Sequence, residues 1–396
     1  MAQLTDLVRT APAAARGERP VATWRQDVIT MVLATWPIMA LYFDARGHNN
    51  DFGQESFWSA AHLFLYAGAS IFTGWIAWLI VNEQLAAGVG RDGRWTPDLA
   101  AIPVGYGTSL IGLMLLMIAG PGDLLWHSRY GFEVGIEAVY SPPHLILFFA
   151  GVLVATTGIR SMWAKPQLVL DYKESVPVVL SLILFLGMAT IVTMYLSAFM
   201  TNVSMTTDFV TDIERFNDDF TNQEQGLNAG LTRYGDDAWP FYYYSGGHGV
   251  AAIVVTTVVL IGPVLQLLRR WRLPMGVFTV SFGGFGLLVN IMTEYRDIVL
   301  VVPLLATGLA IDLLQRPLGS PREDGRLSLG AIRALGPAGA AVLWISYFIV
   351  VAVDKGIGWS PTMWIGALMI GVMTGFGVAF LIAPPSYGPR LVEADG

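Results

Sequence analysis

Long apolar segments separated by shorter polar ones dominate the chain. A helix that crosses a membrane needs about 20 predominantly apolar residues. Ten segments meet this requirement, at residues 27–43, 57–82, 100–120, 141–163, 175–200, 246–268, 275–293, 296–314, 331–353 and 361–383. The pattern predicts an all-α fold, a polytopic membrane bundle of about ten helices.

The polar segments between these helices divide the chain into parts. The predicted parts are an N-terminal tail at 1–26, helices 1–5 within 27–200, an acidic and aromatic loop at 201–245, helices 6–10 within 246–383 and a C-terminal tail at 384–396. The 201–245 loop ends in the aromatic run Trp239–Tyr244, a composition that favours a cap resting at a membrane interface.

Lysine and arginine set the expected orientation, because cytoplasmic segments carry an excess of both. With the N-terminus inside, 17 of the 23 cations fall on the inner side and 17 of the 30 acids on the outer side. We therefore expect both tails to be cytoplasmic in a multi-pass protein of the cell membrane. The acidic outer face would attract cations, although long translocated loops are often acidic for other reasons.

Composition removes several classes of function. The chain is 54% hydrophobic, only 13% charged, and has no cysteine. It therefore has no disulfide, thiolate zinc site or iron–sulfur cluster. The net charge of −7 argues against a nucleic-acid partner.

One stretch, residues 122–147, gathers much of the chemistry between two apolar segments. It holds Asp123, His127, Glu133, Glu137 and His144. Asp123 and His127 share a face if this segment is helical, and so do Glu133 and Glu137. The two glutamates are candidates for a general base, for further ligands or for hydrogen-bond partners of a ligating imidazole; alternatively, both face water on an interfacial helix.

A histidine recurs at the start of three predicted helices that run from the outer to the inner side. Each follows a serine by three residues, in Ser59–His62, Ser141–His144 and Ser245–His248. Serine is a favoured N-cap, so each histidine is expected in a first turn, at one membrane depth. Polar residues at that depth persist mainly where they pair or line a site.

Two imidazoles and one carboxylate suit iron(II), zinc or copper(II), with open positions for further ligands. We therefore predict a metal site at the outer face formed by Asp123, His127 and His144, with His62 and His248 as additional ligands or close neighbours. A proton relay or a structural hydrogen-bond network would use the same residues.

The segment Asp123-Leu124-Leu125-Trp126-His127, followed by Ser141-Pro142-Pro143-His144 at the start of a helix, resembles the C subunit of the copper membrane monooxygenases. This family includes particulate methane and ammonia monooxygenases. The resemblance implies that Asp123, His127 and His144 bind copper. The family's neighbouring Asn/His/His set has no full counterpart here, where only His248 could stand for part of it.

Three hypotheses follow. In the first, the chain is a membrane metalloprotein with copper as the first choice and iron or zinc as alternatives. It would oxidise a small apolar substrate as a monooxygenase-like subunit. The second is a proton- or ion-coupled transporter, and the third is a non-catalytic scaffold of a membrane complex. Expected partners are the lipid bilayer and either further membrane subunits or a second copy of the chain.

Overall fold

The computed structural model describes residues 19–50, 57–90, 93, 96–131, 136–200, 239–318 and 325–385. Throughout these ranges the regular elements are helices. The chain divides into two compact units, one formed by residues 1–194 with 283–298 and the other by 195–282 with 299–396. The predicted all-α class is confirmed.

Eight helices are long and apolar enough to cross a membrane, which makes the chain a multi-pass membrane protein. The remaining two predicted spans correspond to short apolar helices, α12 (Val277–Val289) and α13 (Val301–Leu314). A tight turn separates them, in which Glu294 and Tyr295 adopt left-handed φ angles of 54° and 61°. Because non-glycine residues leave a helix in that conformation, neither short helix continues through the turn.

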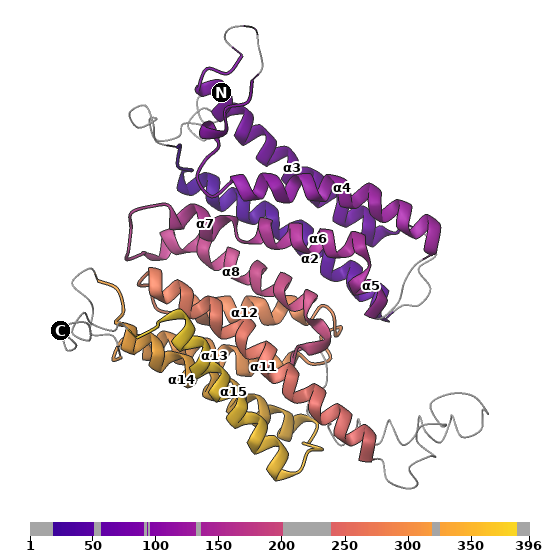
Figure 1. Cartoon of the computed structure of the whole chain (residues 1–396), viewed down its shortest axis with the longest axis vertical. Helices are drawn as coiled ribbons and strands as arrows, with labels where there is room; N and C mark the ends of the chain where they lie inside the picture. Colours follow the sequence, from indigo (N-terminus) through magenta and orange to yellow (C-terminus); the bar gives the residue numbers. More distant parts are fainter. Residues whose placement is uncertain are drawn as a thin grey trace, which may run out of the picture. The chain divides into compact units, whose positions relative to one another are not determined.

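The first unit is a bundle of long helices that pack side by side (Figure 1). Its main helices are α2 (Trp24–Asn50), α3 (Ala60–Ala86), α4 (Gly107–Tyr130), α6 (Pro142–Ala155) and α8 (Tyr172–Val192). Helix α2 packs against α3 and α8, and α4 packs against α6. Two short helices, α5 (Ile136–Tyr140) and α7 (Thr157–Trp163), precede and follow α6.

Helix α4 is longer at its C-terminal end than the apolar pattern predicts. It passes through Pro121 and ends at Tyr130, where Gly131 follows with a φ of 83°. The Gly131 N–H donates to the His127 carbonyl at 3.0 Å. The predicted span ended at residue 120, and the structure extends it: Asp123 and His127 lie on the last turns of a membrane helix.

The second unit is built from α11 (Trp239–Arg270), α13, α14 (Leu329–Asp354) and α15 (Pro361–Ile382). Helix α14 packs against both α13 and α15, and α11 packs against α14 and α15. The aromatic run 239–244 belongs to α11 rather than to a loop. The rest of the predicted 201–245 cap lies outside the described residues.

Candidate metal centre

Four ligand-type side chains from three helices converge at one end of the first unit. Asp123 and His127 lie on the last turns of α4, while His62 and His144 lie in the first turns of α3 and α6. All four are buried, with between 1% and 6% of their surface exposed. The predicted Asp123, His127 and His144 set is therefore brought together, and His62 joins it.

Helix capping explains why two of the histidines sit where they do. Ser59 is the N-cap of α3, and its Oγ accepts from the His62 backbone N–H at 3.2 Å. Ser141 is the N-cap of α6, followed by Pro142 at the first helical position. Both are favoured starting residues, and each places a histidine on the first turn, facing α4.

Backbone carbonyls fix the orientation of two imidazoles. The Nδ1 atom of His127 lies 3.1 Å from the Gly131 carbonyl, and Nδ1 of His144 contacts the Ala138 carbonyl. Because a carbonyl only accepts hydrogen bonds, each Nδ1 carries a proton and donates it. In the neutral ring, Nε2 then keeps its lone pair, and both Nε2 atoms point at Asp123.

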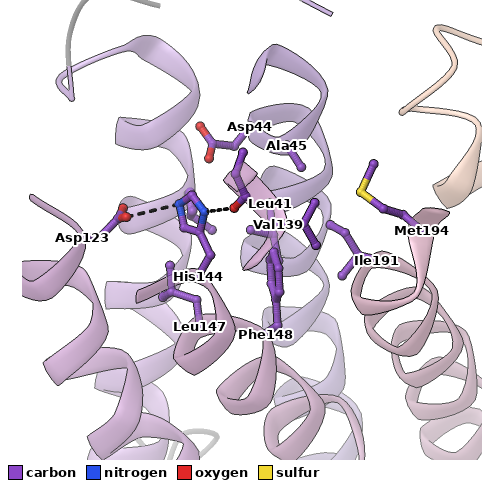
Figure 2. Close-up of a pocket in the computed structure, with 12 residues that line it drawn as sticks. Leu41, Asp44, Ala45, Asp123, Val139, His144, Leu147, Phe148, Ile191 and Met194 are labelled. Atoms are coloured by element: carbon purple, nitrogen blue, oxygen red, sulfur yellow. Dashed lines mark hydrogen bonds and ion pairs between the residues drawn. The ribbon is translucent and has the colours of Figure 1, made fainter. Parts of the chain in front are cut away.

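The carboxylate of Asp123 is the centre of the cluster, and Figure 2 shows its contact with His144. Its Oδ1 lies 3.3 Å from Nε2 of His127 and 3.2 Å from Nε2 of His144. Its Oδ2 accepts the Tyr66 hydroxyl at 3.1 Å and lies 4.0 Å from Nε2 of His62. Tyr66 thus holds one carboxylate oxygen, while the other faces two imidazoles.

These separations suit a shared metal ion. Ligand atoms of His62, Asp123 and His127 all lie within 4.8 Å of one another. A metal bound at about 2.1 Å to each of two donors, at a tetrahedral angle, separates those donors by about 3.4 Å. The Asp123–His127 and Asp123–His144 distances of 3.3 and 3.2 Å are close to that value. The buried group could therefore hold a metal ion.

Asp44 and Tyr66 belong to this site, and sequence reasoning did not find them. Asp44 is 4% exposed, and its Oδ1 lies 3.5 Å from Nδ1 of His62. An ionisable residue near the end of a membrane helix was the available signal. Tyr66 lies one turn after His62 on the same face of α3. The spacing of four residues in the sequence already predicts this shared face.

A glycine on α4 makes the Tyr66 contact possible. A Cβ atom at Gly120 would lie only 3.1 Å from the Tyr66 ring. Without it, the ring packs close to α4, and its hydroxyl reaches Asp123. The sequence around Asp123 therefore provides both the carboxylate and the room for its hydrogen-bond donor.

The remaining predicted residues have different outcomes. Glu133 lies outside the described residues, and Glu137 lies on α5, so both roles stay predictions. His248 lies on α11 in the second unit, and its membership of the site also stays a prediction. The expected first-turn position of His248 is wrong, because α11 begins at Trp239, well before Ser245.

A small cavity adjoins the cluster (Figure 2). Its volume is about 30 Å³, enough for one or two molecules of the size of water. Asp44, Asp123 and His144 contribute its polar wall. The other lining side chains are apolar: Leu41, Ala45, Leu65, Ala138, Val139, Leu147, Phe148, Ile191 and Met194.

Two further hollows follow it along the helices. A cavity of about 50 Å³ shares Leu41 and Leu65 with the first and lies deeper in the bundle. An open groove of about 560 Å³ between α3 and α4 shares Tyr66 and Ala69 with that second cavity. The three hollows thus share lining residues in succession, from the groove at the helix surface to the cavity beside the carboxylate.

A comparison with protein-family models finds no match, and comparisons with curated proteins and with solved structures find none either. The class of the protein therefore follows from its own fold and site: a multi-pass membrane protein with a buried His/Asp cluster that could hold a metal ion.

Proposed function

We propose that this chain is an integral membrane metalloprotein that binds one transition-metal ion through Asp123, His127 and His144, with His62 as a further or exchangeable ligand. One observation carries the proposal. Two imidazoles, each with Nδ1 against a backbone carbonyl, aim their Nε2 atoms at one oxygen of a buried carboxylate.

Three acceptor atoms that converge in this way repel one another unless a cation lies among them. In the described part of the chain, the ion pairs of Asp123 are all with imidazoles. The cation is then either a proton on an imidazole or a metal ion. A metal uses the lone pairs of both histidines at once, which a single proton does not, and we favour it for that reason.

Copper is the first choice among metals. Imidazole and carboxylate ligands without thiolate suit copper(II), zinc and iron(II) alike. The resemblance of residues 123–144 to the copper membrane monooxygenases favours copper. The affinity should fall at low pH, because the histidines must be neutral to ligate.

The apolar cavities beside the centre support a reaction with a small apolar substrate that enters from the bilayer. A monooxygenase inserts one atom of O₂ into a C–H bond and reduces the other to water with two electrons and two protons. An external electron donor is then required, and a partner membrane subunit would supply it. In this proposal Asp44, which lines the cavity, lies close enough to the centre to exchange protons with it.

Metal analysis of gently solubilised protein tests the proposal. We expect about one copper ion per chain, lost in Asp123→Asn and in the double variant His127→Ala/His144→Ala. Glu294→Gln is the matched control, because Glu294 is a carboxylate of the same unit with 42% of its side chain exposed. Electron paramagnetic resonance of the copper(II) form should show nitrogen splitting from the imidazoles.

Iron or zinc with the same dependence on Asp123 would keep the metal centre and remove the copper assignment. A wild-type protein that takes up none of the three metals at neutral pH would contradict the proposal. So would a metal content that survives both variants, provided that their thermal unfolding shows that they are folded.

A further inference from the structure

An open groove of about 740 Å³ lies at the end of the first unit opposite the metal centre. Its walls come from the segments before α2 and α4, from the first turns of α4 and from the end of α7. The polar part of the lining consists of Arg19, Thr108 and Arg160 together with the backbone of Gly105 and Gly107. Acidic side chains are missing from the lining within the described residues.

Both arginines are fixed in place by uncharged partners. Arg19 donates from Nε and Nη2 to the Ile102 carbonyl at 3.2 and 2.9 Å. Arg160 donates to the Gly105 carbonyl at 3.1 Å and to the Leu153 carbonyl at 2.8 Å. For neither arginine does the described part of the chain include a carboxylate within ion-pair distance. Two positive charges are therefore held beside one groove, and the described residues supply no carboxylate partner for either.

The N-terminus of α4 adds hydrogen-bond donors at the same place. Helix α4 begins at Gly107, and no side chain caps it. The Thr108 hydroxyl is buried and has no hydrogen-bond partner among the described residues. Exposed N–H groups and the helix dipole at such a terminus favour a bound anion.

The rest of the groove is apolar and continues along the helix. Ile111 and Met114 are both largely exposed and follow Gly107 on one face of α4. Leu99 and Trp163 also line the groove, and tryptophan favours the interface between membrane and water. A ligand that fits this groove has an anionic head and a hydrocarbon tail.

We propose that the groove binds one anionic phospholipid, with its phosphate at the N-terminus of α4 between Arg19 and Arg160 and an acyl chain along Ile111 and Met114. The charges and the N–H groups complement the phosphate, and the exposed apolar face of α4 complements the chain. The sequence-based orientation places this end at the cytoplasmic leaflet, where anionic lipids attract basic residues.

Lipid binding to the full-length, delipidated protein in detergent tests this inference. Phosphatidylglycerol, phosphatidylcholine and inorganic phosphate are titrated separately and followed by native mass spectrometry and thermal unfolding. We expect phosphatidylglycerol to bind more tightly than phosphatidylcholine and to raise the unfolding temperature. Arg19→Gln should weaken phosphatidylglycerol binding by about fivefold, and Thr108→Val should weaken it by a smaller factor.

Arg25→Gln is the matched control, because Arg25 is an exposed cation in the first turn of α2 that does not line the groove. Three results would overturn the inference. The first is equal binding of the two lipids, and the second is equal weakening by Arg25→Gln and Arg19→Gln. The third is inorganic phosphate that reproduces the whole stabilisation, which would make the groove a site for a free anion. Metal loading does not enter the measurement, so its outcome is independent of the proposed metal function.

Discussion

The first unit buries carboxylates near both ends of α2, and the carboxylates at the two ends have different partners. Near the start of the helix, Asp27 forms an ion pair with Lys165 at 2.7 Å and accepts the Tyr106 hydroxyl at 2.9 Å. Near its other end, Asp44 and Asp123 face three histidines. The first acid has a permanent cation from the chain itself. The ion pairs of the second group, within the described residues, are with imidazoles, whose charge depends on their protonation.

The charge of a buried acid that pairs with a lysine is neutralised as soon as the chain has folded, so such an acid contributes to structure. The charge of a buried acid that faces imidazole lone pairs is neutralised only when a cation binds, so such an acid can bind and release that cation. We therefore propose that Asp27 stabilises the fold, whereas Asp123 and its neighbours bind a ligand. Three substitutions test this assignment, beginning with the largest expected effect.

Lys165→Met should be the most destabilising of the three. It leaves Asp27 buried without its cation, and breaking such a pair from one side costs about 3–5 kcal/mol in the free energy of unfolding. Denaturant unfolding in detergent micelles measures the change. The metal content of the purified protein should stay that of the wild type.

The double variant Asp27→Asn/Lys165→Met should recover most of that loss, since removing both charges also removes the uncompensated one. A double variant as unstable as Lys165→Met would indicate that Lys165 stabilises the fold through contacts other than this ion pair. Loss of metal from either variant would show that the two ends are not independent.

Tyr66→Phe should have an intermediate effect, confined to the metal centre. It removes the hydroxyl that donates to Asp123 Oδ2 and keeps the ring. Loss of a hydrogen-bond partner of a metal ligand typically lowers metal affinity about 10–100-fold. Competition with a chelator of known affinity measures it.

Tyr106→Phe is the matched control for this substitution, because the Tyr106 hydroxyl makes the equivalent bond to Asp27. It should reduce stability and leave metal affinity unchanged. If both tyrosine variants change metal affinity equally, the hydroxyl of Tyr66 has no specific role at the centre.

Arg46→Gln should have the smallest effect. Arg46 pairs with Glu294 at 2.8 Å, but the two side chains are 43% and 42% exposed. Exposed pairs contribute about 0–1 kcal/mol, so the unfolding midpoint should shift little and the metal content should not change. A loss as large as that of Lys165→Met would mean that the membrane shields this pair from water.

Much of the fold could be predicted because crossing a membrane requires long apolar helices, and their lengths can be counted in a sequence. The predicted spans at 275–293 and 296–314 are longer than α12 and α13, and Glu294 and Tyr295 adopt left-handed conformations in the turn between the two helices. Apolar length also places the end of α4 too early, because the apolar run stops before Asp123 and His127. Both residues are buried on the last turns of the helix.

The proximity of Asp123, His127 and His144 could be predicted from local features, namely spacing by four residues and capping serines. Asp44 and Tyr66 could not be assigned in this way, because their roles depend on which helices are neighbours. Apolar patterns predict the helices α2, α3 and α4. They do not predict which of these helices pack together. The prediction for His248 assumed that a helix begins at Ser245. Helix α11 begins at Trp239 instead, so His248 does not lie in its first turn.

One helix, α4, carries the proposed phosphate site at its beginning and two of the proposed metal ligands at its end. From Thr108 to Asp123 it rises about 22 Å. The length of α4 therefore sets the distance between the two sites, which lie toward opposite membrane surfaces. A single inserted residue would lengthen it by about 1.5 Å and turn Asp123 by about 100° away from His144. Changes in the thickness of this bundle should therefore come in whole turns of α4, and a lipid held at one surface would set the depth of the metal at the other.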